Sequence, residues 1–131
     1  MSTPEGAVQS AVLDFLDFYE ATGRLWYNRF NNLPVFDKST GRCRSMGKGA
    51  KKGIADILVH LKGKSLWLEI KRPERKVLRK DGTWQVLGKG YQSKEQKVFE
   101  EQVTRQGAKY ALVYSVADAQ KIIEEELGNE A

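Results

Sequence analysis

The segment GIADILVHLKGKSLWLEIKRP, residues 53–73, predicts the centre of the fold, because two apolar runs of strand length flank a short turn. The runs cover residues 53–59 and 66–71, and the glycine between them favours a tight hairpin turn. A hairpin centred between Lys62 and Gly63 places Asp56 directly opposite Glu69, with their Cβ atoms about 4.5–5.5 Å apart. Lys71 lies two residues beyond Glu69, so it points to the same face of the strand.

Two carboxylates that face each other on neighbouring strands repel and destabilise a hairpin. A divalent cation between them removes this repulsion, and hard oxygen ligands suit Mg²⁺ or Mn²⁺. An adjacent lysine can hold a phosphate or help to activate a water. Asp56, Glu69 and Lys71 therefore predict a site for metal-assisted hydrolysis of a phosphodiester. The competing interpretation is a pair of solvent-facing acids, with Lys71 in an ordinary salt bridge to one of them.

Length and composition favour one globular domain over residues 1–131, with 40% hydrophobic and 30% charged residues. The single cysteine, Cys43, excludes an intrachain disulfide and fits a reducing compartment. No apolar run approaches the ~20 residues of a membrane helix. The first residues are acidic and do not resemble a signal peptide. We therefore expect a cytoplasmic protein that has no membrane partner.

The charge of the chain is unevenly distributed. The overall net charge is +5, but the window from Lys38 to Lys109 holds 19 of the 22 basic residues and only 7 of the 17 acidic ones, a net charge of +12. A basic middle with acidic ends favours a polyanion such as DNA as the partner, although a solvated lysine-rich surface has the same composition. The candidate DNA-binding residues are Lys51, Lys52, Arg72, Arg75, Lys76, Arg79 and Lys80.

Turn, capping and periodicity signals predict the order of elements. The expected elements are a helix from Pro4 to about Gly23, a strand over 25–30, hairpin strands over 54–61 and 65–71, a small second hairpin around Asp81-Gly82, a helix over 93–106, a strand over 110–114 and a last helix to about Leu127. Residues 37–53 read as a basic loop that orders on binding DNA. This order predicts an α/β fold, with a mixed sheet and helices on its faces.

The chain resembles the PD-(D/E)xK nucleases, and more narrowly the virus-type replication-repair nuclease (VRR-NUC) domain, over most of its length. The motifs that carry the resemblance are Glu5 with Gln9, Asn31-Asn32, Gly53-Ile54-Ala55-Asp56, Leu68-Glu69-Ile70-Lys71-Arg72-Pro73, Ser93-Lys94-Glu95-Gln96 with Phe99, and the segment 111–118. One departure is Ala55, which stands where the family usually has proline. Proline at that position shapes the backbone and contributes no chemistry.

The resemblance implies a restriction-endonuclease-like core with the order α-β-β-β-(hairpin)-α-β-α and a metal-dependent endonuclease activity. It implies catalytic roles for Asp56, Glu69, Lys71 and Gln96. The implied metal ligands are Asp56, Glu69, the Ile70 carbonyl and Glu5. Stand-alone members of such families often act as homodimers on branched DNA, including Holliday junctions. A small nuclease of this kind would suit a phage or a mobile element, and hence the cytoplasm of a bacterial or phage-infected cell.

Several roles stay open on the sequence alone. Gln96 is also the N3 residue of a capping box, and Glu5 also suits the positive end of a helix dipole. Trp67 is expected in the core, on the face away from Glu69. The alternative functions are a non-catalytic nucleic-acid-binding module, which needs no metal, and a sequence-specific restriction enzyme, for which the chain offers no recognition domain.

Overall fold

The computed structural model describes residues 3–30, 36–37, 41–43 and 51–128. Its elements are α1 (Pro4–Ala21), β1 (Trp26–Arg29), β2 (Phe36–Asp37), β3 (Arg42–Cys43), β4 (Ile57–Leu61), β5 (Lys64–Ile70), β6 (Arg75–Leu78), β7 (Trp84–Leu87), α2 (Lys94–Arg105), β8 (Lys109–Val113) and α3 (Val116–Leu127). The expected α/β class is therefore confirmed. Asn31, Asn32 and most of the expected basic loop lie outside the described residues.

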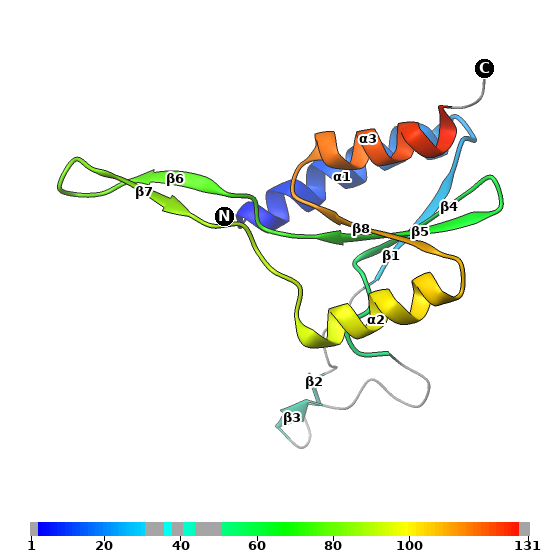
Figure 1. Ribbon diagram of the computed structural model, residues 1–131, viewed down its shortest axis with the longest axis horizontal. Coiled ribbons are helices and arrows are strands. Elements are labelled where there is room, and N and C mark those ends of the chain that lie inside the picture. The colour runs from blue at the N-terminus through cyan, green and yellow to red at the C-terminus, as the bar shows by residue number, and fades with distance from the viewer. Residues whose placement is uncertain (1–2, 31–35, 38–40, 44–50, 129–131) are drawn as a thin grey trace.

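The main sheet has four strands in the order β1-β4-β5-β8. Strand β4 is antiparallel to β1 and to β5, whereas β5 and β8 are parallel, so the sheet is mixed as expected. Helices α1 and α3 lie together on one face of this sheet and α2 lies on the other (Figure 1). The parallel pair requires a crossover, and α2 lies within the connection that supplies it.

The register of the central hairpin is the one that the sequence predicts. Ile57 pairs with Leu68 and Leu61 pairs with Lys64 around a turn in which Lys62 and Gly63 both have positive φ. The first strand begins at Ile57, however, and not at residue 54 as expected. The chain bends at Asp56, whose side chain and not its backbone carbonyl accepts the hydrogen bond from β5.

The two faces of the sheet are packed differently. The side chains of Ile57, Val59, Leu66, Leu68 and Ile70 are fully buried against α1 and α3 and form the main core. The opposite face is covered by α2 through an aromatic cluster of Trp67, Phe99 and Tyr110.

In that cluster the Trp67 ring packs edge-on against Phe99 of α2, with ring centroids 4.9 Å apart. The expectation that Trp67 faces away from Glu69 is wrong, because residues two apart on a strand share a face. Trp67 and Glu69 therefore both lie under α2, and the aromatic contact fixes that helix beside the carboxylate.

The second hairpin forms as predicted, but it stands apart from the main sheet. Strands β6 and β7 pair only with each other and form a separate two-stranded sheet. In Figure 1 this hairpin projects beyond the main body of the protein. Among the described residues, no helix is both long and apolar enough to cross a membrane.

Candidate metal and catalytic site

Asp56 reaches the site from the bend before β4. Its Oδ2 accepts a hydrogen bond of 2.7 Å from the backbone N–H of Ile70, and its own carbonyl accepts one of 2.8 Å from Phe30. These two bonds fix the carboxylate between β1 and the end of β5. Burial raises the pKa of Asp56 above its usual range, although the Ile70 amide opposes that shift.

Glu69 is the only buried charged residue in the described part of the chain, with 3% of its surface exposed. Its Oε1 accepts a hydrogen bond of 2.6 Å from Nε2 of Gln96. Its Oε2 is buried and has no hydrogen-bond partner among the described residues. Burial first, and the neighbouring Asp56 charge second, raise the pKa of Glu69 to about 8. The carboxylate is thus held in a place where ionisation is unfavourable without a further positive charge.

Lys71 follows β5 and lies beside Glu69, as the strand alternation predicts. Its Nζ is 3.5 Å from Oε1 of Glu69 and donates a hydrogen bond of 2.7 Å to Oε1 of Gln96. Only 11% of its side chain is exposed. The ion pair of the competing interpretation is therefore present, but it lies inside the same cluster as the two acids.

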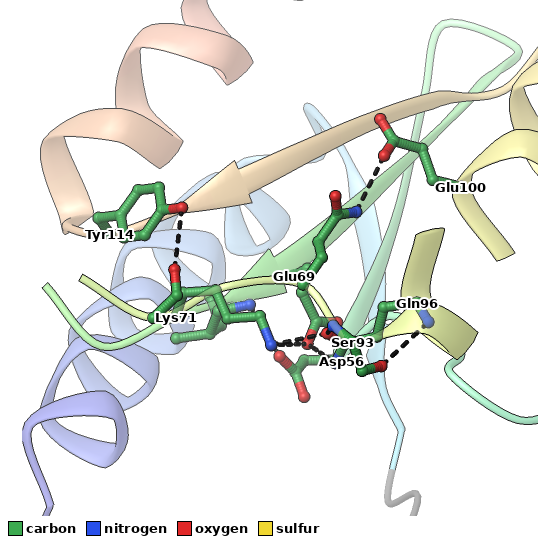
Figure 2. Close-up of polar contacts among 10 residues, drawn as sticks. Asp56, Glu69, Lys71, Ser93, Gln96, Glu100 and Tyr114 are labelled. Carbon is green, nitrogen blue, oxygen red and sulfur yellow. Dashed lines mark hydrogen bonds and ion pairs between the residues drawn. The ribbon is translucent and has the colours of Figure 1, made fainter. Parts of the chain in front are cut away.

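Gln96 joins helix α2 to this cluster. Its Oε1 accepts a hydrogen bond of 2.8 Å from the Ser93 backbone and so completes the expected capping box. The same oxygen accepts from Lys71, and the amide nitrogen donates to Glu69. Figure 2 shows these side chains converging between the end of β5 and the start of α2. The capping role is confirmed, and one side chain also contacts two site residues.

Gly53 has a role that the sequence analysis missed. It has a φ of +72°, and a Cβ at this position would lie 2.4 Å from the Glu95 carbonyl and 2.7 Å from the backbone nitrogen of Gln96. Only glycine allows the chain before Asp56 to pass this close to the first turn of α2. The sequence signal for this role is Gly53 itself, in the motif Gly53-Ile54-Ala55-Asp56. The part of α2 that it passes lies more than forty residues further along the chain.

The donor set fits a hard divalent cation. Two carboxylates lie on adjacent segments, and one of them has a buried oxygen that finds no partner in the part of the chain that the structure describes. Mg²⁺ and Mn²⁺ prefer such oxygen ligands. The Ile70 peptide lies between the two acids, and its N–H is already engaged by Asp56. Among the described residues, no three His, Cys, Asp or Glu side chains are grouped so that together they could hold a metal ion.

Glu5 consequently does not join the two acids as a third side-chain ligand in this geometry. It is exposed in the first turn of α1, as expected for a residue that favours the helix dipole, and its charge contributes to the raised pKa of Asp56. Glu5 lines an open cleft together with Lys71, Arg72 and Arg75. Its proposed part in the metal site stays a prediction.

The candidate DNA-binding residues occupy two places. Arg72 and Arg75 line the cleft beside Lys71, and Lys76, Arg79 and Lys80 continue outward along the second hairpin. All five are exposed. Lys51 instead lines a second cleft, which is bordered by Trp67 and α2, and Lys52 is exposed next to it along the chain. The structure thus joins five of the seven cations into one path that starts at the site.

A scan against protein-family models, a search of curated proteins and a search of solved structures find no match to this chain. The resemblance to the VRR-NUC domain therefore stays a prediction.

Proposed function

We propose that this chain is a Mg²⁺- or Mn²⁺-dependent DNA endonuclease of the PD-(D/E)xK class, with a restriction-endonuclease-like core of VRR-NUC type. The observation that carries the proposal is the Asp56–Glu69 pair, in which a buried oxygen of Glu69 lacks a partner among the described residues and Lys71 lies 3.5 Å from the other oxygen. Burying Glu69 beside the half-buried Asp56 is costly for a structure that never binds a cation. We expect a protein to keep this unfavourable arrangement only if ionised carboxylates are needed at this place.

Each residue has a proposed part in the reaction. Asp56 and Glu69, with the Ile70 carbonyl, would hold the cation, which when bound lowers the pKa of a water and neutralises charge developing on the phosphate. Lys71 carries a positive charge at the same edge and would stabilise the developing negative charge or orient the water. Gln96 holds Lys71 and Glu69 in their relative positions through its two hydrogen bonds.

The proposed substrate is DNA, and branched DNA such as a Holliday junction is favoured over a sequence motif. The exposed cations would contact phosphates, which position a duplex without reading its bases. A two-fold homodimer would present two active sites to a symmetric junction, and the cytoplasm of a bacterial or phage-infected cell is the proposed setting.

The test is cleavage of a labelled four-way junction and of a linear duplex with the same arms, each with Mg²⁺, Mn²⁺ or EDTA. Metal-dependent cuts by the wild-type protein, absent with Glu69→Ala, support the proposal. The matched control is Glu101→Ala, which removes an exposed carboxylate on the far part of α2 and should cut like wild type. Electrophoretic binding assays with the same DNA show whether Glu69→Ala still binds.

Three outcomes would separate the alternatives. Cleavage by Glu69→Ala at the wild-type rate would refute the site assignment. Equal cutting of junction and duplex would keep the nuclease but remove its selectivity for branched DNA. Salt-sensitive binding without cleavage under any metal would identify a non-catalytic binding module.

A further inference from the structure

The β6–β7 hairpin carries an apolar strip that nothing in the described structure covers. Residues directly opposite on paired strands share a face, so Leu78 with Trp84 and Lys76 with Val86 lie on one side of the hairpin. Leu78, Trp84 and Val86 are 57%, 64% and 54% exposed. An exposed strip of this kind on a projecting element is typical of a binding surface.

The hairpin is fixed in shape at both ends. At its tip, Arg79 donates a 2.7 Å backbone hydrogen bond to Thr83, and Asp81 accepts bonds from the backbone and hydroxyl of Thr83. At its base, the N–H of Gly90 donates a 2.8 Å bond to the carbonyl of Arg72. A free two-stranded hairpin is only marginally stable in water, so these ties hold the strip in position before any partner arrives.

The charge around the strip selects its partner. From the start of β6 to the end of β7 the hairpin has four basic residues, Arg75, Lys76, Arg79 and Lys80. Its one acidic residue over the same range is Asp81. Two copies of the hairpin packed against each other would bring like charges together, whereas DNA offers the complementary charge. A two-stranded ribbon also has the size that the major groove of DNA admits.

We propose that the β6–β7 hairpin is a wedge for branched DNA, in which the strip of Leu78, Trp84 and Val86 stacks on bases at the branch point and the flanking cations hold the backbone. This inference rests on the proposed function, whose substrate it specifies. Apolar side chains unstack base pairs when they insert between them, and the cost is lowest where pairs are already open, as at a branch. Trp84 offers the largest ring for stacking.

The position of the hairpin also predicts where the cut falls. Leu78 follows Lys71 by seven residues, so at about 3.3 Å per residue their Cα atoms lie at most about 23 Å apart, and Trp84 lies directly opposite Leu78. DNA rises about 3.4 Å per nucleotide along one strand. The scissile phosphate should therefore lie within about seven nucleotides of the branch point.

The test measures binding of the full chain in EDTA, so that it does not depend on catalysis. Fluorescence anisotropy gives the affinities for a four-way junction and for a linear duplex with the same arms. Trp84→Ala should weaken junction binding by about tenfold or more and duplex binding by less than about twofold. The matched control is Trp26→Ala, which removes a tryptophan that is 54% exposed on β1, outside the hairpin. Leu78→Ala gives a second, independent result on the same strip.

Equal affinity of Trp84→Ala and wild type for the junction would overturn the wedge. Conversion of a dimer to a monomer by Trp84→Ala in sedimentation would also overturn it and would assign the strip to contacts between copies of the chain. Cleavage separates this failure from failure of the proposed function, because a nuclease without a wedge would still cut DNA in Mg²⁺ and would still lose that activity in EDTA or with Glu69→Ala.

Discussion

Replacing Glu69 with glutamine should stabilise the metal-free protein in a manner that depends on pH. The pKa of Glu69 is raised from 4.5 to about 8, because the carboxyl group is buried beside Asp56. The unfolded chain releases this proton near pH 4.5, whereas the folded protein keeps it to about pH 8. The folded state therefore binds more protons between these values, and the free energy of unfolding falls as pH rises through the window.

The magnitude follows from the window. Between pH 4.5 and pH 7 the loss is about 1.4 kcal/mol per pH unit, or about 3 kcal/mol in total. Glutamine keeps the shape of the side chain and cannot ionise, so the variant escapes this loss. The free energy of unfolding of Glu69→Gln minus that of wild type should therefore increase by about 3 kcal/mol from pH 4.5 to pH 7. Other carboxyl groups titrate in both proteins and largely cancel in the difference.

Urea unfolding in EDTA, followed by circular dichroism at several pH values, provides the measurement. Glu125→Gln is the matched control, because it makes the same substitution at an exposed position of α3 and should show no comparable increase. A flat difference for Glu69→Gln as well would refute the reasoning, since it would show that Glu69 ionises as easily in the folded protein as in the unfolded chain. Saturating Mg²⁺ should stabilise wild type selectively at pH 7 and reduce the advantage of the variant.

Three further changes test the elements around the site. Gly53→Ala should be more destabilising than Gly63→Ala and should also slow cleavage, because both positions have positive φ but only the first meets the backbone of α2; thermal unfolding and cleavage rates compare the two. Gln96→Ala and Ser93→Ala should each cost about 1 kcal/mol of stability by weakening the cap, but only the first removes the bonds to Lys71 and Glu69 and should slow cleavage; equal rates for the two variants would leave Gln96 with a capping role alone. Alanine at Arg79 or Lys80 should lower the slope of log affinity against log salt by about 0.9 for each lost phosphate contact, with Lys121→Ala on α3 as the control whose slope should not change.

Local sequence signals were sufficient for the elements whose geometry depends on near neighbours. The glycine turn and the alternation of apolar residues fix the register of β4 and β5, and this register brings Asp56 to Glu69. The capping box likewise predicts the start of α2, since its bonds join residues three apart. These are the places where one stretch of chain contains both partners of the interaction.

Contacts between segments that are distant in the sequence could not be predicted from local patterns. Strand β4 begins three residues late because the Asp56 side chain takes the bond from Ile70, and no local pattern distinguishes a side-chain acceptor from a backbone one. The close passage of Gly53 along α2 depends on where that helix lies, which the sequence does not state. The position of Trp67 needs no distant contact, because the strand period alone places it on the same face as Glu69.

The capping box connects these two levels, and it explains why the site depends on the fold of α2. The Gln96 side chain is held by the Ser93 backbone, so its amide group is oriented before it contacts Lys71 and Glu69. A helix start that needs only four residues of local sequence thereby positions the side chain of Glu69 on β5 and that of Lys71 just after it, more than twenty residues earlier. Freedom of α2 to shift is further restricted by Gly53 on one side and by the packing of Phe99 on Trp67 on another. The site is therefore preorganised by contacts that are each structural by themselves, and the proposed cation would meet the Glu69 oxygen that has no partner among the described residues.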